Sequence, residues 1–243
     1  MISLSPRQGP SCDAVERQLR ASKLFQGLSA PLLVELAATS VKKRFSRGEH
    51  LWRDGDQATH FVLIAAGLVK IVQRAADQTE SIIGLFGPRE AVGTVALLRR
   101  GRYPASAVAA SEHVDVLKLD PAPVLTAMDT DPSAARAMNG ALLEQTRALH
   151  EKISVMSAGA VPQRLATQLL TLAERFGDDH DDGTLSVPLV LSRTEVACLV
   201  GARVETTIRV LAGWQRAKVI EFSRAGISIL QPEALRAVAR GKD

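Results

Sequence analysis

The sequence predicts an α+β protein built from three parts, and three observations support this prediction. Residues 23–130 consist of short β-type runs divided by turn residues, and residues 131–158 follow a helical pattern. Residues 159–243 contain two helical patterns separated by one glycine and followed by a β-hairpin pattern. A block of strands followed by a block of helices is typical of α+β proteins rather than of alternating β and α units. Residues 1–22 form an N-terminal extension.

Length and composition indicate a globular chain with room for one large or two ordinary domains. The 243 residues are 46% hydrophobic, which suffices for real cores, and a formal net charge of +4 favours an anionic partner only weakly. Cys12 and Cys198 are too few for a disulfide framework. The start lacks a secretory signal pattern, and the apolar runs fall short of the roughly 20 residues of a membrane span. We therefore expect a cytoplasmic protein with no membrane partner.

Turn residues divide residues 23–130 into the strands of an all-β roll. Each apolar run between them is of strand length, and Gly and Pro are the strongest breakers of such runs. The turn signals are Arg47-Gly48-Glu49, Asp54-Gly55-Asp56, Ala66-Gly67 and Gly87-Pro88.

Residues 131–158 predict one long amphipathic helix. Asp131 can cap its first turn, and Pro132 fits the first helical position. Apolar residues then recur every seven positions and widen into a stripe, which is typical of a coiled-coil-like seam. The residues expected at a dimer interface along this seam are Met138, Leu142, Leu149, Ile153 and Met156. A core helix packed on its own β-roll would show a similar stripe, and this alternative stays open.

Residues 191–215 predict a helix-turn-helix. Ser192 and Glu195 have the spacing of a capping box, which starts the first helix. Gly201 can adopt the left-handed conformation that ends this helix and turns the chain sharply. The second helix follows with an apolar stripe at three-to-four-residue spacing opposite a polar face.

Residues 218–230 contain two β-branched runs around residues 223–226, which is a β-hairpin pattern. A hairpin placed after the second helix is the wing of a winged helix-turn-helix. Between Ser192 and Leu230 six basic residues stand against three acidic ones. This excess is expected of a surface that contacts the phosphates of double-stranded DNA.

The second helix also supplies candidates for reading bases. Glu205 and Arg209 lie one helical turn apart, and they have complementary chemistry. Arg209 can donate two hydrogen bonds to guanine and Glu205 can accept one from cytosine, so a G·C pair is expected in each half-site. Ile208 beside them would suit a thymine methyl group. The residues expected to contact phosphates are Arg193, Arg203 and Thr206.

These residues resemble the CRP/FNR family of bacterial transcription regulators, and the resemblance covers about residues 24–230. Val204-Glu205-Thr206 followed by Arg209 is similar to the fumarate-and-nitrate-regulator branch, and RGEHLWRDGD followed by an apolar hairpin resembles the family's cyclic-nucleotide-binding-type β-roll. The resemblance implies a homodimer paired through the long helix, an effector sensed in the β-roll and an inverted-repeat operator with TTGAT-like half-sites. For an activator it also implies RNA polymerase as a partner.

The effector pocket that the resemblance implies departs from that of cyclic-AMP-binding members. Thr94 stands where those members have a ribose-binding glutamate, and Pro104-Ala105 stands where an arginine and a serine would hold the phosphate. Because a missing charge-neutralising contact is costly in a buried site, we do not expect cyclic AMP to be the effector. The pocket candidates are Thr94, Tyr103, Pro104, Ala105 and His150.

The effector itself, a small molecule or a gas, stays unidentified at this point. Haem is one candidate by analogy with gas-sensing relatives, with an axial ligand drawn from His50, His60 and His113. An iron–sulfur cluster is not expected, because it needs about four thiolates and Cys12 cannot supply them. The acidic run from Gly177 to Gly183 is expected to be solvated and not to bind a metal.

Other classes of protein share parts of this pattern. A metal-dependent enzyme on a β-roll would need two or three histidines on adjoining strands, and it would leave the helix-turn-helix unexplained. A regulatory module of a larger enzyme would need a catalytic domain that this sequence lacks. A DNA-binding regulator without an effector is a further alternative. We expect no catalytic residues and a DNA-binding regulator.

Overall fold

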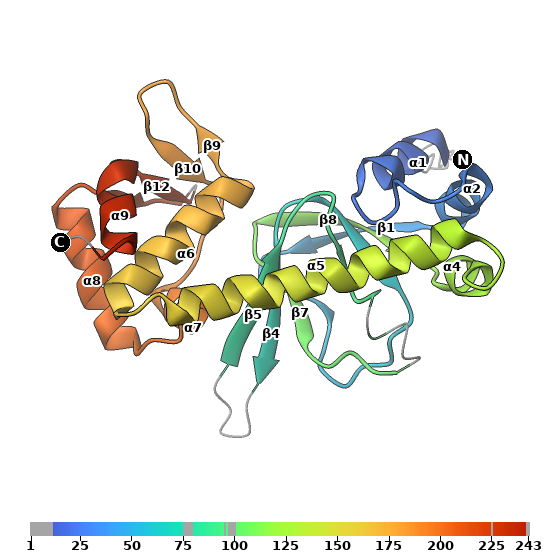
Figure 1. The fold of residues 1–243 in the computed structure, drawn as a ribbon, viewed down its shortest axis with the longest axis horizontal. Coiled ribbons are helices and arrows are strands. Elements are labelled where there is room, and N and C mark those ends of the chain that lie inside the picture. The colour runs from blue at the N-terminus through green and yellow to red at the C-terminus, as the bar shows by residue number, and fades with distance from the viewer. Residues whose placement is uncertain (1–11, 75–79, 95, 97–100, 225, 242–243) are drawn as a thin grey trace, which may run out of the picture.

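The computed structural model describes residues 12–74, 80–94, 96, 101–224 and 226–241. Its N-terminal half is a β-roll covered by short helices, and its C-terminal half is a compact group of helices with a small sheet (Figure 1). One long helix, α5, runs alongside both halves (Figure 1). This arrangement confirms the α+β class. In the described residues, no helix combines the length and the apolar character needed to cross a membrane.

Two four-stranded antiparallel sheets form the β-roll. One has the order β1-β8-β3-β6 and the other β2-β7-β4-β5. The strands are β1 (Val41–Ser46), β2 (His50–Trp52), β3 (Phe61–Ala66), β4 (Val69–Arg74), β5 (Glu80–Phe86), β6 (Ala91–Val92), β7 (Ser106–Ala109) and β8 (His113–Leu119). Helices α1 (Cys12–Ala21) and α2 (Ala30–Thr39) precede them, and α4 (Ala122–Ala127) follows.

Strand β3 shows why its run of apolar residues is uninterrupted. Successive side chains of a strand point to opposite faces of the sheet. Phe61 and Leu63 belong to the core that contains α1 and α2, whereas Val62 and Ile64 belong to the core between the two sheets. Both faces of β3 are therefore buried, so both sets of positions need apolar side chains.

Helix α5 (Pro132–Ser157) begins at the expected cap. The side chain of Asp131 accepts a hydrogen bond of 2.8 Å from the backbone N–H of Ser133. The hydroxyl of Ser29 also donates to Asp131, over 2.6 Å, which ties the start of α2 to the start of α5. These hydrogen bonds hold the pKa of the Asp131 carboxyl below its ordinary value.

The first turns of α5 pack on their own domain, and this corrects one interface prediction. Met138 is only 2% exposed and lies in the core shared with α1, α2 and α4, so it is not available to a second copy. The other four predicted interface residues are exposed. Their exposed fractions are 44% for Leu142, 46% for Leu149, 60% for Ile153 and 49% for Met156. The apolar stripe of α5 is thus buried in the domain core near the start of the helix and exposed at these four residues further along.

The C-terminal half carries the helix-turn-helix and its hairpin. Its elements are α6 (Val161–Phe176), β9 (Asp178–Asp179), β10 (Leu185–Val187), α7 (Arg193–Val200), α8 (Val204–Arg216), β11 (Ile220–Phe222), β12 (Ile227–Ile229) and α9 (Pro232–Ala239). The strands form an antiparallel sheet in the order β11-β12-β10-β9. The predicted wing is therefore present as β11 and β12.

Local signals set the geometry of the helix-turn-helix. Ser192 and Glu195 make the capping box at the start of α7, with each side chain bonded to the backbone N–H of the other residue. Gly201 ends α7 with φ of 58°, in the left-handed region that disfavours residues with a Cβ. The helices then pack through buried Val196, Leu199 and Leu211.

The β-roll and the C-terminal half share one apolar core. Leu68 and Leu85 of the roll belong to the same cluster as Leu169 and Leu172 of α6. Two cationic side chains of the β-roll also contact the C-terminal half. Lys70 forms an ion pair of 2.5 Å with Glu195, and a guanidinium N–H of Arg47 donates to the carbonyl of Val190 over 2.7 Å.

Candidate DNA-binding surface and effector cavity

Helix α8 presents the three predicted base-reading residues to solvent. Glu205 and Arg209 are exposed, and Ile208 is 45% exposed. Thr207 is fully buried instead, so the apolar stripe of α8 runs through Thr207 and leaves Ile208 free. Positions i, i+3 and i+4 share one face of a helix, so these side chains form one exposed surface.

The residues predicted to contact phosphates occupy different environments. Arg203 is exposed at the N-cap position of α8, and Thr206 is half-buried one turn later. Arg193 is half-buried and lies over the ring of Phe222 at 3.7 Å, and it donates to the side chain of Gln215 over 2.8 Å. Arg193 therefore links α7 to the wing, which its position in the sequence did not indicate.

Two cations that no sequence pattern indicated hold the end of α7. The ammonium of Lys152 on α5 donates to the carbonyls of Cys198 and Leu199 over 3.1 and 2.5 Å. Arg164 on α6 donates to the carbonyl of Val200 over 3.1 Å. The last carbonyls of a helix lack partners within it and carry partial negative charge, so these cations stabilise the end of α7. Burial lowers the pKa of Lys152.

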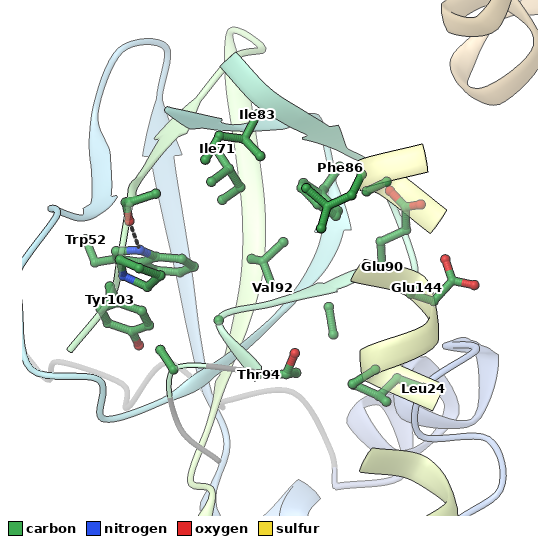
Figure 2. Close-up of a pocket in the computed structure, with 18 of the residues that line it drawn as sticks. Leu24, Trp52, Ile71, Ile83, Phe86, Glu90, Val92, Thr94, Tyr103 and Glu144 are labelled. Carbon is green, nitrogen blue, oxygen red and sulfur yellow. Dashed lines mark hydrogen bonds between the residues drawn. The ribbon is translucent and has the colours of Figure 1, made fainter. Parts of the chain in front are cut away.

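A cavity of about 360 Å³ lies inside the β-roll and is bordered by α5. Figure 2 shows Trp52 and Tyr103 at one end and Glu144 of α5 at the other. The Trp52 and Tyr103 rings are stacked with centroids 4.2 Å apart, and the Trp52 indole N–H donates to the carbonyl of Ala105 over 2.9 Å. The Tyr103 hydroxyl donates to the carbonyl of His60 over 2.9 Å, and burial raises its pKa.

Four of the five pocket candidates line this cavity. They are Thr94, Tyr103, Pro104 and Ala105. His150 was predicted to point toward the effector, and this prediction is wrong: it is exposed and not part of the lining. Helix α5 lines the cavity through Ala141, Glu144, Ala148 and Leu149. At 3.6 residues per turn, His150 lies about 100° further round than Leu149 and faces away.

No histidine or cysteine of the described residues lines the cavity, and this weighs against haem. The three candidate axial ligands were His50, His60 and His113, and all lie outside the lining. The imidazole of His60 is in hydrogen-bond contact with the hydroxyl of Thr59 at 2.6 Å, and burial lowers the pKa of His60. Within the described residues, no group of three metal-ligating side chains is present either.

A cluster of ion pairs joins the cavity wall to the C-terminal half. Glu90 lines the cavity, and its carboxylate lies 3.0 Å from the guanidinium of Arg175 on α6. Arg175 also pairs with Glu151 of α5 at 3.0 Å. Beside Glu90, Gly87 lets Phe176 of α6 approach so closely that an added Cβ would lie 2.7 Å from its ring. The cavity wall and α6 are thus held together by charge and by packing.

Two family models match the chain, one over each half. A cyclic nucleotide-binding domain matches residues 42–131, and a Crp-like helix-turn-helix domain matches residues 163–238. The chain belongs to the CRP/FNR family. It is therefore a transcription regulator with a cyclic-nucleotide-binding-type domain and a DNA-binding helix-turn-helix, and its relatives are regulators rather than enzymes.

Relatives of this CRP/FNR-family regulator match over nearly their whole length. The CRP-like cAMP-activated global transcriptional regulator of Mycobacterium tuberculosis is 28% identical over 222 residues, 91% of this chain and 98% of the relative. The nitrogen fixation regulation protein FixK of Bradyrhizobium diazoefficiens is 25% identical over 221 residues, 91% of each chain. Among solved structures, a CRP-family transcriptional regulator of Thermus thermophilus superposes with a TM-score of 0.69 at 25% identity, covering 82% of this chain and 97% of that one.

Proposed function

We propose that the protein is a homodimer that binds specific DNA sequences and whose DNA affinity is controlled by a small molecule bound in the β-roll cavity. The observation that carries this proposal is the exposed face of α8, where Glu205, Ile208 and Arg209 stand together on a capped helix-turn-helix. We expect Arg203 and Thr206, at the start of α8, to meet phosphates beside that face. In this proposal residues 159–243 form the DNA-binding domain.

The uncovered part of α5 supports the homodimer. Leu142, Leu149, Ile153 and Met156 are large apolar residues that remain 44–60% exposed on one helix. Leu142, Leu149 and Met156 recur every seven residues, and Ile153 lies four residues after Leu149, which is the spacing of a seam between paired helices. We infer that residues 131–158 are the dimerisation helix, and that a second copy covers this stripe across a two-fold axis.

Effector control is supported by the physical link between cavity and C-terminal half. Glu90 belongs both to the cavity wall and to the ion pair with Arg175 of α6, so a ligand that moves this wall also acts on α6. Relatives differ in their effectors. The M. tuberculosis regulator is named as cAMP-activated, whereas a regulator of Xanthomonas campestris with a TM-score of 0.65 at 22% identity, covering 83% of this chain and 99% of that one, is described as c-di-GMP responsive.

The expected operator follows from the two-fold symmetry of the dimer. Two copies of α8 should read an inverted repeat whose half-sites lie about one helical turn, roughly 34 Å, apart. The recognition-helix residues support TTGAT-like half-sites with a G·C pair read by Arg209 and Glu205. RNA polymerase is the further partner if the regulator activates transcription.

Selection of bound sequences from random DNA tests the proposed function directly. The purified protein should enrich an inverted repeat, and the enriched sequence should compete better than bulk DNA in an electrophoretic mobility shift. Enrichment of a single unrepeated site would contradict the dimeric mode of binding. Retention of DNA without any sequence preference would contradict the base-reading role of α8.

Cyclic AMP should not bind this cavity tighter than about 10 µM, which corresponds to roughly 7 kcal/mol. Thr94 and Pro104-Ala105 stand where the family resemblance implies ribose and phosphate contacts; they line the cavity and offer no charge to a phosphate. Calorimetry on protein that shifts its selected operator checks this. Tighter binding would show that another cation of the cavity holds the phosphate.

A further inference from the structure

Arg89 occupies a backbone conformation that few residues of its type adopt. Residues 87–90 form a tight turn in which the N–H of Glu90 donates to the carbonyl of Gly87 over 3.1 Å. Pro88 is the second residue of this turn, and Arg89 is the third, with φ of 70°. That combination is the pattern of a type II turn, whose third position favours glycine because a Cβ is strained there. An arginine at such a strained position is a candidate for a functional role.

Arg89 borders the cavity, and its side chain has no charged partner within the described part of the chain. Arg89 and Lys23 line the cavity and are exposed, and neither has an ion pair within the described residues. Among the described residues, the two carboxylates of the lining are engaged: Glu90 pairs with Arg175, and Glu144 pairs with Arg147 at 2.9 Å. The charge left uncompensated at the cavity is therefore positive, which favours an anion.

The interior of the cavity is apolar. Figure 2 shows the side chains of Leu24, Ile71, Ile83, Phe86 and Val92 around it. Among the described residues of the lining, Gln73 and Thr94 add an amide and a hydroxyl. The indole N–H of Trp52 and the hydroxyl of Tyr103 are already bonded to backbone carbonyls. At roughly 30 Å³ for each water-sized group, the 360 Å³ hold about twelve non-hydrogen atoms. A ligand of this size must be mostly hydrocarbon to match such walls.

We propose that the effector is an apolar monocarboxylate of about ten carbon atoms, whose carboxylate pairs with Arg89 and whose hydrocarbon part fills the cavity. Lys23 borders the same cavity and adds a second positive charge to its lining. This inference rests on the proposed function, in which the cavity is the effector site. Arg89 is followed directly by Glu90, which forms the ion pair with Arg175 of α6. The turn that binds the ligand's carboxylate is therefore the turn that contacts α6.

Calorimetry with decanoate and decanamide tests the proposal. The two probes have the same number of non-hydrogen atoms and differ in charge. Decanoate should bind the full-length protein about tenfold tighter, because a carboxylate makes charge-assisted bonds with a guanidinium that a neutral amide does not. Binding of decanoate should also change the fluorescence of Trp52, which lines the cavity.

Arg89→Gly separates binding from folding. Glycine relieves the left-handed strain, which offsets the added freedom of the unfolded chain, so Tm should stay within about 3 °C of the wild type. The variant should lose most of the preference for decanoate, because Lys23 is then the remaining unpaired cation of the described lining. Arg89→Lys should keep part of the preference for decanoate, and Lys42→Ala, which removes an exposed charge outside the cavity, should keep all of it.

Three results would overturn the proposal. Equal binding of the two probes to the wild type would show that the cavity does not recognise a carboxylate, and failure of both to bind would exclude this ligand class. A preference that is undiminished in Arg89→Gly would remove Arg89 from the site. None of these results bears on the proposed DNA binding, which the selection from random DNA measures without any effector probe.

Discussion

Leu149→Glu should convert the protein from a dimer to a monomer in sedimentation and remove its specific binding to the selected operator. Leu149 lies in the middle of the uncovered stripe of α5 and is 46% exposed. In a dimer it would be buried against the second copy, where an unpaired carboxylate is strongly disfavoured. A monomer binds one half-site, so the gain from binding both at once, about 10²-fold or more, is lost.

Two further variants show whether the seam causes this effect. Leu149 also borders the cavity, whereas Ile153 does not, so Ile153→Glu should give the same monomer without changing the cavity wall. Ser154→Glu places the same charge on an exposed position about 100° further round α5 and should stay dimeric. If Leu149→Glu and Ile153→Glu both remain dimeric, the second copy does not cover this stripe.

Arg209→Ala should weaken binding at one base pair of each half-site by about 1–3 kcal/mol and relax the preference there. Arg209 is exposed on the same face of α8 as Glu205, so its guanidinium can reach guanine in the major groove. Selection from random DNA with the variant should recover the inverted repeat with the G·C position no longer specified. Affinity measured on the wild-type operator gives the size of the loss.

Arg203→Ala is the matched control for Arg209→Ala. Arg203 is an exposed arginine at the start of the same helix, where a phosphate contact is expected. Its loss should weaken binding to all DNA sequences about equally. It should also reduce the slope of log affinity against log salt concentration by about one. If Arg209→Ala behaves in this way too, Arg209 is a phosphate contact and the base-reading face lies elsewhere on α8.

Several elements were predictable because their causes lie within a few residues of one another. The capping box of Ser192 and Glu195, the left-handed Gly201 and the hairpin that follows α8 are each set by local hydrogen bonds and backbone sterics. The long helix α5 was predictable for the same reason, since Asp131 and Pro132 mark its start. The shared polar face of Glu205 and Arg209 on α8 follows from helical spacing alone.

Other features depend on which elements meet, and no local pattern contains that information. The stripe of α5 predicted an apolar face but did not show that Met138 would be buried in its own domain while Ile153 would stay exposed. His150 and Leu149 are neighbours in sequence, yet only Leu149 borders the cavity, because one residue of helix turns a side chain through about 100°.

The sequence by itself determined the order of the elements, the helix-turn-helix with its wing and the departure of Thr94 and Pro104-Ala105 from a phosphate site. Tertiary structure alone decided the contacts between the halves. Glu90 meets Arg175 and Lys152 meets the end of α7 across separations of 85 and 47 residues. Such pairs form only when packing of apolar faces brings distant charges together, so the path from cavity to α6 could not be predicted from either charge alone.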